Sequence, residues 1–286
     1  MTLGETLDRA ARELADHGIE NARLEAEILL RHALSLDRVN LYANLQWTVS
    51  AEQALSYTSL VQRRITHEPT AYIIGYREFY GLDFEVDRSV LIPRPETELI
   101  VEKAIDLASR VSSEQCLIAD VGTGCGAIAV SLAVNLPQTK VYAVDLSVDA
   151  LRVAGRNCER HGVIDRVTLL QGDILYGLPE QLHIIVANMP YVRDTEFTEI
   201  SQEVGGFEPR LALSGGDDGL SQIRRLLEQA PVYIVQGGAV LLEVAHDQAH
   251  EVCEIAGQYF PDAEISVDQD LSGLERVVCI YTRGKR

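Results

Sequence analysis

Apolar side chains recur every three or four positions over roughly the first 73 residues, which predicts helices that each bury one face. Thr2 and Ser50 each precede a glutamate or a glutamine by three residues, the spacing of a capping box, and mark two helix starts. Asn21 is expected to cap a further helix. We predict a small helical bundle over residues 1–73, which either docks a substrate or serves as a structural cap.

The period of the pattern changes to two between residues 74 and 95, where apolar positions alternate on either side of Gly81. This alternation predicts a β-hairpin that links the bundle to the rest of the chain. At its end Pro93 and Pro95 flank Arg94 and fix an extended loop, and Pro95 can begin a helix. Arg94 is then either a surface residue of a rigid linker or part of an active-site wall.

Short apolar runs alternate with helical patterns from about residue 113 onward, which predicts a parallel, doubly wound α/β sheet. The expected strands are 116–121, 141–145, 167–171, 182–187 and 238–243, followed by a closing hairpin of 263–268 and 276–281. The expected helices are 127–136, 146–157, 217–227 and 246–259. Asp217 is expected to cap the third of these helices. Residues 192–216 lack a period and are expected to form a long loop beside the site. The catalytic domain is thus expected to span residues 96–286.

Polar residues and glycines follow four of these strands directly. They are Gly122-Thr123-Gly124-Cys125-Gly126, Asp145, the pair Asp173 and Ile174, and Asn188. Because the carboxyl ends of parallel strands meet at one edge of a sheet, these groups converge on one crevice. Glycines let a ligand approach the backbone, and a carboxylate such as Asp145 can accept both ribose hydroxyls of a nucleoside. Taken singly, each has a simpler explanation: Asp145 can cap a helix, and Asp173 can lie in a plain turn.

The stretch Asn188-Met189-Pro190-Tyr191 carries the most specific chemistry. Pro190 restricts Met189 to an extended backbone, so the side-chain oxygen of Asn188 and the carbonyl oxygen of Met189 can point the same way. Two fixed acceptors, with the ring of Tyr191 beside them, hold a planar NH2 group and stabilise positive charge that develops on its nitrogen. Such a site suits N-methylation of an amide or an amino group. Glu243, at the end of a later strand, either holds the NH2 of Asn188 or is solvated.

Composition narrows the classes of function. The chain has 286 residues and a formal net charge of -18, and its basic residues are scattered, which disfavours a nucleic-acid substrate. Five cysteines without a C-x-x-C pair disfavour a disulfide framework or a zinc site and fit a reducing cytosol. We identify no signal peptide and no apolar run long enough to cross a bilayer, and therefore expect a cytoplasmic protein that does not bind membranes.

On these residues the chain resembles the PrmC/HemK family of protein-(glutamine-N5) methyltransferases, which act on peptide-chain release factors. The resemblance covers nearly the whole length. The matching motifs are Phe79-Tyr80-Gly81-Leu82, Ile92-Pro93-Arg94-Pro95-Glu96-Thr97-Glu98, Asp120-Val121-Gly122-Thr123-Gly124, Asn188-Met189-Pro190-Tyr191, Glu208-Pro209-Arg210-Leu211-Ala212-Leu213 and Gly215-Gly216-Asp217-Asp218-Gly219-Leu220. Met189 departs from the commonest form of the family motif, which has proline there. A methionine offers the same backbone carbonyl with less rigidity.

The resemblance implies a class I methyltransferase fold, which is Rossmann-like with a seven-stranded, mostly parallel sheet. It also implies S-adenosylmethionine as the methyl donor, S-adenosylhomocysteine as its product, and no metal. The implied donor site consists of residues Gly122, Thr123, Gly124, Cys125 and Gly126 for the methionine part, Asp145 for the ribose, Asp173 and Ile174 for the adenine, and Asn188. The implied substrate site consists of Asn188, Met189, Pro190, Tyr191 and Arg94, with Asn188 and Tyr191 as the catalytic residues.

The implied substrate is the glutamine of the Gly-Gly-Gln loop in class-1 release factors. One alternative is an adenine-N6 methyltransferase acting on DNA or RNA, which the acidic charge disfavours. A second is a glutamine methyltransferase that acts on another translation protein and shares the same chemistry. A third is a binding protein that keeps the fold without turnover, against which Asn188 and Asp145 argue.

Overall fold

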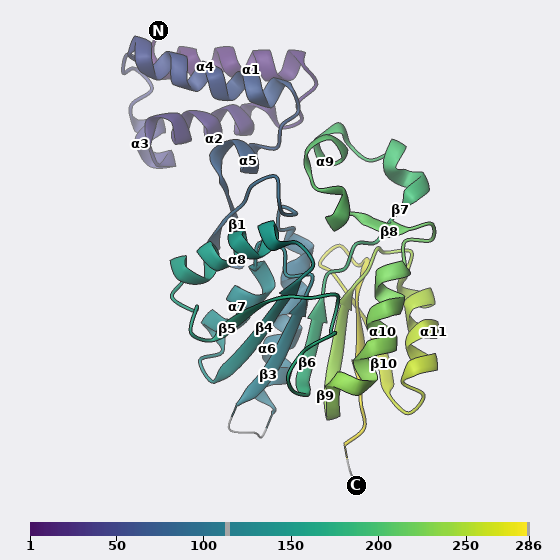
Figure 1. Cartoon of the computed structure of the whole chain (residues 1–286). Coiled ribbons are helices and arrows are strands. Elements are labelled where there is room, and N and C mark those ends of the chain that lie inside the picture. The colour runs from purple at the N-terminus through teal and green to yellow at the C-terminus, as the bar shows by residue number, and fades with distance from the viewer. Residues whose placement is uncertain (112–114, 285–286) are drawn as a thin grey trace. The chain divides into compact units, whose positions relative to one another are not determined.

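The described part of the chain groups into two compact units. The computed structural model describes residues 1–111 and 115–284, so the expected start of the strand–helix alternation near residue 113 lies outside the described residues. Unit 1 is Met1–Tyr76 together with Ser201–Phe207, and unit 2 is Arg77–Ile200 together with the chain from Glu208 onward (Figure 1). The domain boundaries expected at residues 73 and 95 stay a prediction. Within the described residues, no helix is both long and apolar enough to cross a membrane.

Unit 1 is helical. Its helices are α1 (Leu3–Asp16), α2 (Ala22–Leu34), α3 (Arg38–Ala43), α4 (Ala51–Ile65), α5 (Thr70–Ile74) and α9 (Gln202–Phe207). Both predicted capping boxes are present, at Thr2 and at Ser50. Asn21 is the N-cap residue of α2 as expected, but its backbone is left-handed (φ 52°) and its side chain makes no capping bond to the described residues. The apolar faces of α1, α2, α3, α4 and α5 meet in one buried core.

The predicted hairpin is present as β1 (Tyr76–Phe79) and β2 (Leu82–Glu85). Tyr80 and Gly81 between the strands both have positive φ, 52° and 72°, as the tight turns that match strand twist require. After the two prolines the chain forms the 3-10 turn η1 (Pro95–Thr97) and then α6 (Glu98–Ser109), so Pro95 begins a helical segment as expected.

Unit 2 is built on a seven-stranded sheet in the order β10-β11-β9-β6-β3-β4-β5. Its strands are β3 (Cys116–Val121), β4 (Thr139–Asp145), β5 (Val167–Gln171), β6 (Leu182–Ala187), β9 (Ile234–Glu243), β10 (Glu264–Gln269) and β11 (Glu275–Tyr281). β3, β4, β5, β6 and β9 are parallel. At one end β11 pairs antiparallel with β9 and β10 pairs antiparallel with β11, so β11 is the one of these seven strands that runs against the others. The predicted seven-stranded, mostly parallel sheet is confirmed.

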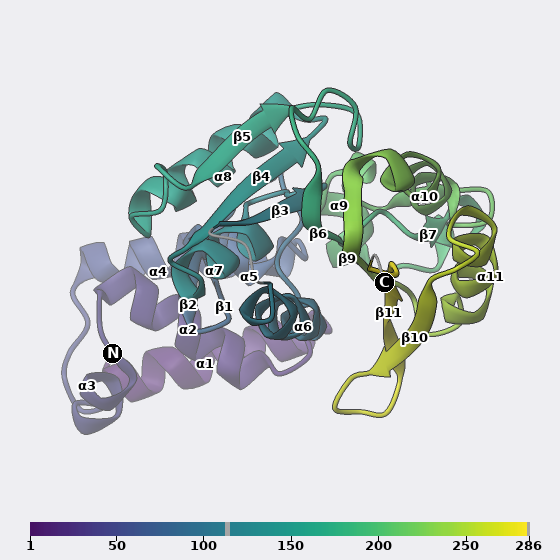
Figure 2. The same ribbon diagram turned by 90° about the horizontal axis from the view of Figure 1, so that it is seen from below.

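Helices cover both faces of this sheet, which explains why central strands such as β3 and β6 are buried along nearly their whole length. α6, α7 (Ala127–Asn135) and α8 (Val148–Arg160) pack on one face, and α10 (Ser221–Tyr233) and α11 (Ala249–Tyr259) on the other (Figure 2). The core between the sheet and α10–α11 is continuous and includes Met189.

Two expectations for residues 192–227 are wrong. The supposed loop carries short elements: β7 (Val192–Arg193), η2 (Asp194–Thr198), α9, η3 (Arg210–Ala212) and β8 (Ser214–Gly216). These are held by side-chain contacts rather than by a period of apolar residues. Asp217 does not cap the next helix, because α10 begins at Ser221; instead, Asp218 accepts a hydrogen bond from the Leu220 N–H (3.0 Å) and pairs with Arg224.

Candidate active site

A cavity of about 530 Å³ lies at the carboxyl edge of the sheet in unit 2. The chain runs outward from β3 through β4 to β5 and then crosses to β6 on the other side of β3, so the strand order reverses between β3 and β6. Open α/β sheets bind ligands at such a point. The predicted site residues that line the cavity are Gly122, Gly124, Asp145, Asp173, Ile174, Asn188, Met189 and Pro190.

Five predicted site residues do not line it, namely Thr123, Cys125, Gly126, Arg94 and Tyr191. The first three shape the glycine turn from behind. The Thr123 hydroxyl donates to Asp120 (2.6 Å), and the carbonyl of buried Cys125 accepts a hydrogen bond from the Asn157 amide (2.8 Å). Gly126 has φ 82°, and a Cβ there would lie 3.2 Å from the Cβ of Ala154. These residues therefore set the path of the backbone that faces the cavity.

The glycine turn and Asp145 are joined by backbone donors. The carboxylate of Asp145 accepts from the Gly124 N–H (2.8 Å) through Oδ2 and from the Ser147 N–H (2.9 Å) through Oδ1. Burial raises the pKa of Asp145, and these N–H groups oppose that rise. The helix cap that Asp145 could have provided is Ser147 instead, whose hydroxyl accepts from Ala150 N–H (3.2 Å). Each Asp145 oxygen keeps a second lone pair for a ligand hydroxyl.

Asp120 is a site-supporting residue that sequence reasoning did not single out. It is fully buried at the end of β3, and its Oδ2 accepts from the Thr123 hydroxyl and from the Ala129 N–H (3.0 Å). Its Oδ1 is buried with no hydrogen-bond partner among the described residues. Burial raises the pKa of Asp120 to about 7. The sequence signal that could have identified Asp120 is a single acidic residue in an otherwise apolar strand that leads into a glycine turn.

Asp173 and Ile174 occupy opposite environments at the end of β5. Asp173 is exposed and pairs with Arg225 of α10 (2.6 Å), whereas Ile174 is buried with a left-handed backbone (φ 61°). Such a backbone is unusual for a β-branched residue and is held here by the packing of its side chain in the core. An acid and an apolar side chain therefore border the same part of the cavity.

Asn188 is held from behind by Thr97. Its Nδ2 donates to the Thr97 hydroxyl (3.1 Å), which leaves Oδ1 available to the cavity. Met189 is 6% exposed; its side chain packs in the core, and its sulfur would lie 3.6 Å from a Cβ at Gly122. Only the backbone of Met189 can therefore serve as a second acceptor, as the sequence argument requires.

Glu243 is buried beside Asn188 and is not solvated. It is 2% exposed, and burial raises its pKa to about 7, although hydrogen bonds with Thr97 and Asn188 and the charge of Arg276 oppose this rise. Of the two roles that the sequence left open, the structure favours contact with the Asn188 amide.

Tyr191 is half-buried, and its hydroxyl is influenced by the charge of Glu243. Burial raises the pKa of its hydroxyl to about 12, so the ring stays neutral at physiological pH. Its carbonyl accepts from the side chain of buried Gln248 (3.0 Å). Gly219 packs against both groups, and a Cβ on it would lie 2.5 Å from each. The Gly-Gly-Asp-Asp-Gly-Leu motif thus supports the backbone of Tyr191.

One residue ties two walls of the cavity together. Glu208 is 6% exposed, accepts from the Ile92 N–H (3.2 Å) and pairs with Arg94. Residues 89–91, just before Ile92, line the cavity, and so do residues 209–212, just after Glu208. Arg94 therefore braces the wall instead of lining the cavity.

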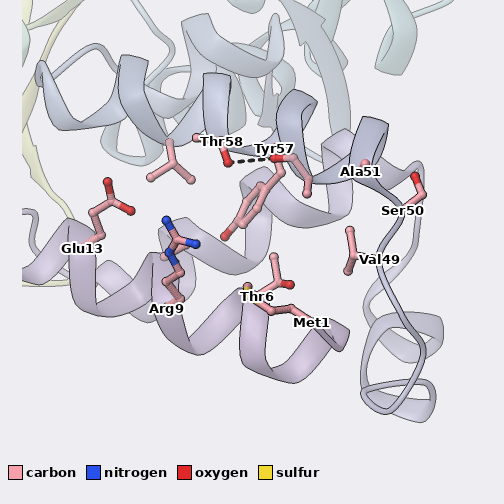
Figure 3. A pocket seen from close by; sticks show the side chains of 12 residues that line it. Met1, Thr6, Arg9, Glu13, Val49, Ser50, Ala51, Tyr57 and Thr58 are labelled. Carbon is pink, nitrogen blue, oxygen red and sulfur yellow. Dashed lines mark hydrogen bonds between the residues drawn. The ribbon is translucent and has the colours of Figure 1, made fainter.

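A second hollow of about 350 Å³ lies in unit 1, between α1 and α4 (Figure 3). Three of its hydroxyl groups donate to backbone carbonyls: Thr6 to Thr2 (2.8 Å), Tyr57 to Ala26 (3.0 Å) and Thr58 to Ala54 (2.7 Å), while that of Ser50 accepts from the Gln53 N–H (3.2 Å). These side chains stabilise the helices, and none of the described residues that line the hollow positions a reactive group. The chemistry therefore belongs to the cavity of unit 2.

The sheet order, the helices on both faces and the cavity at the strand ends define a class I methyltransferase fold. Residues 5–75 match the family described as PrmC N-terminal domain, and residues 100–204 match the family described as methyltransferase small domain. A solved methyltransferase from Pyrococcus furiosus is 21% identical, covers 72% of this chain and 91% of its own, and has a TM-score of 0.52, which shows the same fold.

Curated relatives match over almost the full length. A release factor glutamine methyltransferase from Geobacter sulfurreducens is 42% identical over 279 residues, which are 97% of this chain and 95% of that protein. One from Moorella thermoacetica is 42% identical over 99% of both chains. The chain belongs to the release factor glutamine methyltransferase family. The resemblance inferred from the sequence motifs is confirmed.

Proposed function

We propose that this protein methylates the side-chain amide nitrogen of the glutamine in the Gly-Gly-Gln loop of class-1 release factors. One observation carries the proposal: Asn188 lies at the cavity with its NH2 tied to Thr97 and its oxygen available (Nδ2–Oγ1 3.1 Å). An amide oxygen held in this way accepts a hydrogen of another amide. The name shared by the curated relatives agrees with this substrate class.

The residues at the cavity suit S-adenosylmethionine. The volume of about 530 Å³ lies within the range of small-molecule sites, roughly 300–1,000 Å³. Gly122 and Gly124 would border its methionine part, Asp145 would accept its ribose hydroxyls, and Asp173 with Ile174 would border its adenine. When bound, S-adenosylmethionine supplies an electrophilic methyl group. Asp120, buried behind the turn with an unpartnered oxygen, adds negative potential where a cationic ligand would sit.

The acceptor residues aim and polarise the glutamine. Oδ1 of Asn188 and the carbonyl of Met189 would each accept one hydrogen of the substrate NH2, which fixes the direction of its nitrogen. Both oxygens also stabilise positive charge that develops on that nitrogen. Tyr191, whose high pKa keeps it neutral, would pack against the amide without taking its proton. The N–C bond would form as the S–C bond to the methyl group breaks, and the nitrogen would then release its extra proton to water.

The parts of the chain take different roles in this proposal. Residues 1–73 dock the release factor, 74–95 form the hairpin linker, and 96–286 carry the reaction. The match of residues 5–75 to a domain specific to this family supports the first assignment. We place the reaction in the cytoplasm, the compartment of translation.

The test is transfer of labelled methyl groups. The full chain is incubated with methyl-labelled S-adenosylmethionine and, in separate reactions, an unmethylated class-1 release factor, the same factor with its Gly-Gly-Gln glutamine replaced by alanine, DNA and RNA. We expect label on the first factor alone. Label on nucleic acid only would establish the adenine-N6 alternative and overturn the proposal. Label on another protein of a translation extract, with none on release factors, would assign the same chemistry to a different substrate.

A further inference from the structure

Three side chains from distant parts of the chain meet behind the acceptor oxygen of the site. Thr97 ends η1, Asn188 follows β6, and Glu243 ends β9. β6 and β9 are parallel neighbours with Ala187 opposite Leu242, so the next residues, Asn188 and Glu243, lie side by side. Thr97 is 5% exposed and Glu243 is 2% exposed. None of the roles described so far requires an acid at this place.

We propose that Glu243 is a positioning residue that, together with Thr97, fixes which end of the Asn188 amide faces the substrate. The inference rests on the proposed function and concerns the same site. An asparagine amide is nearly symmetrical in shape, and only its hydrogen-bond partners decide whether its oxygen or its NH2 points into the cavity. If the NH2 pointed inward, it would face the NH2 of the glutamine, donor against donor.

The direction of the hydrogen bonds follows from the carboxylate. An ionised Glu243 can only accept, so the single hydrogen of the Thr97 hydroxyl turns toward it. The lone pairs of that hydroxyl are then left to accept from Asn188, as the 3.1 Å Nδ2–Oγ1 contact shows. The carboxylate of Glu243, next to Asn188 on the neighbouring strand, also favours the NH2 end of that amide over its oxygen. Both contacts therefore hold Nδ2 inward and leave Oδ1 for the substrate.

The energetics of the acid point to a role other than stability. Oε2 of Glu243 is buried with no hydrogen-bond partner in the part of the chain that the structure describes. Burying a charge in this way destabilises a fold unless the charge is fully paired. An amide at this place would avoid the charge, but its NH2 could donate to Thr97 and reverse the network. A group that can only accept is what the orientation of Asn188 needs.

The network also predicts an acid limb in the pH profile. Burial raises the pKa of Glu243 to about 7, and the groups that face it are Arg276 on β11, Glu96 on η1 and Tyr191 after β6. As the pH falls below that value, Glu243 gains a proton and becomes a donor toward Thr97. The Thr97 hydroxyl is then free to donate to Oδ1 of Asn188, so we expect kcat to fall on the acid side.

The test compares Glu243→Gln with the exposed control Glu264→Gln, and Thr97→Val with Thr97→Ser. We expect Glu243→Gln to lower kcat for the release factor about tenfold at pH 8, less than the roughly 100- to 1,000-fold expected when an oriented polar group is removed outright, because Asn188 itself is still present. Its acid limb should disappear, while its Tm and its Kd for S-adenosylmethionine stay near wild type. Thr97→Val should lose activity, and Thr97→Ser, which keeps the hydroxyl, should retain it. Wild-type kcat in Glu243→Gln, or an unchanged acid limb, would overturn the proposal.

A second measurement does not depend on turnover. In nitrogen-15 spectra the side-chain NH2 signals of Asn188, assigned with Asn188→Ala, should shift with a midpoint near pH 7 in wild type and stay constant in Glu243→Gln. If wild type fails to methylate the release factor but this titration is present, the proposed function fails and the orienting network stands. If wild type methylates the factor and the titration is absent, the network fails and the function stands.

Discussion

The two halves of the cavity are built in different ways. The half that would hold the methyl donor is made from backbone: the glycine turn after β3 binds the Asp145 carboxylate through the Gly124 N–H, a contact over 21 residues. The half that would hold the glutamine is made from side chains that join distant segments, such as Asn188 to Thr97 over 91 residues and Arg94 to Glu208 over 114. A turn and its strand specify the first half locally, whereas the second half exists only once the whole unit has folded.

Asn188→Ala is expected to show the largest difference between the two halves, because it should impair methyl transfer and leave donor binding nearly intact. Loss of one oriented acceptor should lower kcat by roughly 100- to 1,000-fold, by analogy with removal of a polar group that stabilises developing charge. Donor binding, measured by calorimetry with S-adenosylmethionine, should change little because the glycine turn and Asp145 are untouched. Asn135→Ala on the surface of α7 is the matched control. Equal losses in kcat and in donor affinity would contradict the division of the cavity into a donor half and an acceptor half.

Gly219→Ala tests how strongly the acceptor half depends on distant packing. A Cβ there would lie 2.5 Å from the Tyr191 carbonyl and from Gln248, at a φ of 78°. Gly273→Ala is a close control, because that residue has the same φ of 78° with nothing within 4 Å of an added Cβ. We expect about 1 kcal/mol of destabilisation for Gly273→Ala from the backbone alone, and more than about 3 kcal/mol for Gly219→Ala, where overpacking adds to it. Urea unfolding measures both free energies. Similar values would mean that the Tyr191 carbonyl and Gln248 move to accommodate the added methyl group.

Asp145→Asn tests the donor half. The carboxylate accepts from Gly124 through one oxygen and from Ser147 through the other, so an asparagine would turn its NH2 toward a backbone N–H. Leaving a donor unpaired costs about 1–3 kcal/mol, and a loss of this size in donor binding corresponds to roughly a 5- to 150-fold rise in the Kd for S-adenosylmethionine. The kcat at saturating donor should be nearly unchanged. Asp149→Asn, at an exposed position of α8, should leave the Kd unaltered.

The same contrast explains how much could be predicted from the sequence. β3, β5 and β6 match the expected strands residue for residue, because a buried parallel strand is a continuous apolar run between turn residues. The short elements between residues 192 and 216 could not be predicted, because they have no period of their own. The helix start expected at Asp217 failed because α10 begins only at Ser221, after a turn in which Asp218 accepts from the Leu220 N–H and pairs with Arg224.

At the site, the residues after the strands could be placed from the order of the elements alone. Their partners could not. Thr97 and Glu208 belong to motifs that resemble the family, yet nothing local in the sequence says that the first holds Asn188 or that the second holds Arg94. Arg94 does not line the cavity but pairs with Glu208, and its expected role at the substrate site stays a prediction.

Glu208→Gln tests this brace with a smaller effect. Glutamine keeps an oxygen for the Ile92 N–H but loses the ion pair with Arg94, whose side chain is about one-third exposed. A partly exposed pair is worth about 1 kcal/mol at most, so we expect a several-fold rise in KM for the release factor and little change in kcat. The effect should shrink as salt is added, because the lost interaction is screened. Glu228→Gln on the exposed face of α10 is the control. An equal change in KM in that variant would contradict a role of the Glu208–Arg94 pair in supporting the cavity wall.

Met189 is the position where the two halves touch, and Met189→Leu should have the smallest effect. Its side chain packs in the core with its sulfur beside Gly122, while the proposed function assigns its carbonyl to the acceptor half. Leucine keeps the volume and the carbonyl, so we expect less than about 1.5 kcal/mol in stability and kcat within a few-fold of wild type. Met189→Ala should cost about 2–5 kcal/mol and weaken donor binding, since it opens a void beside Gly122. A large loss of kcat in Met189→Leu with stability intact would mean that the thioether itself contacts the substrate, and the residue would then belong to the acceptor half by its side chain and not only by its backbone.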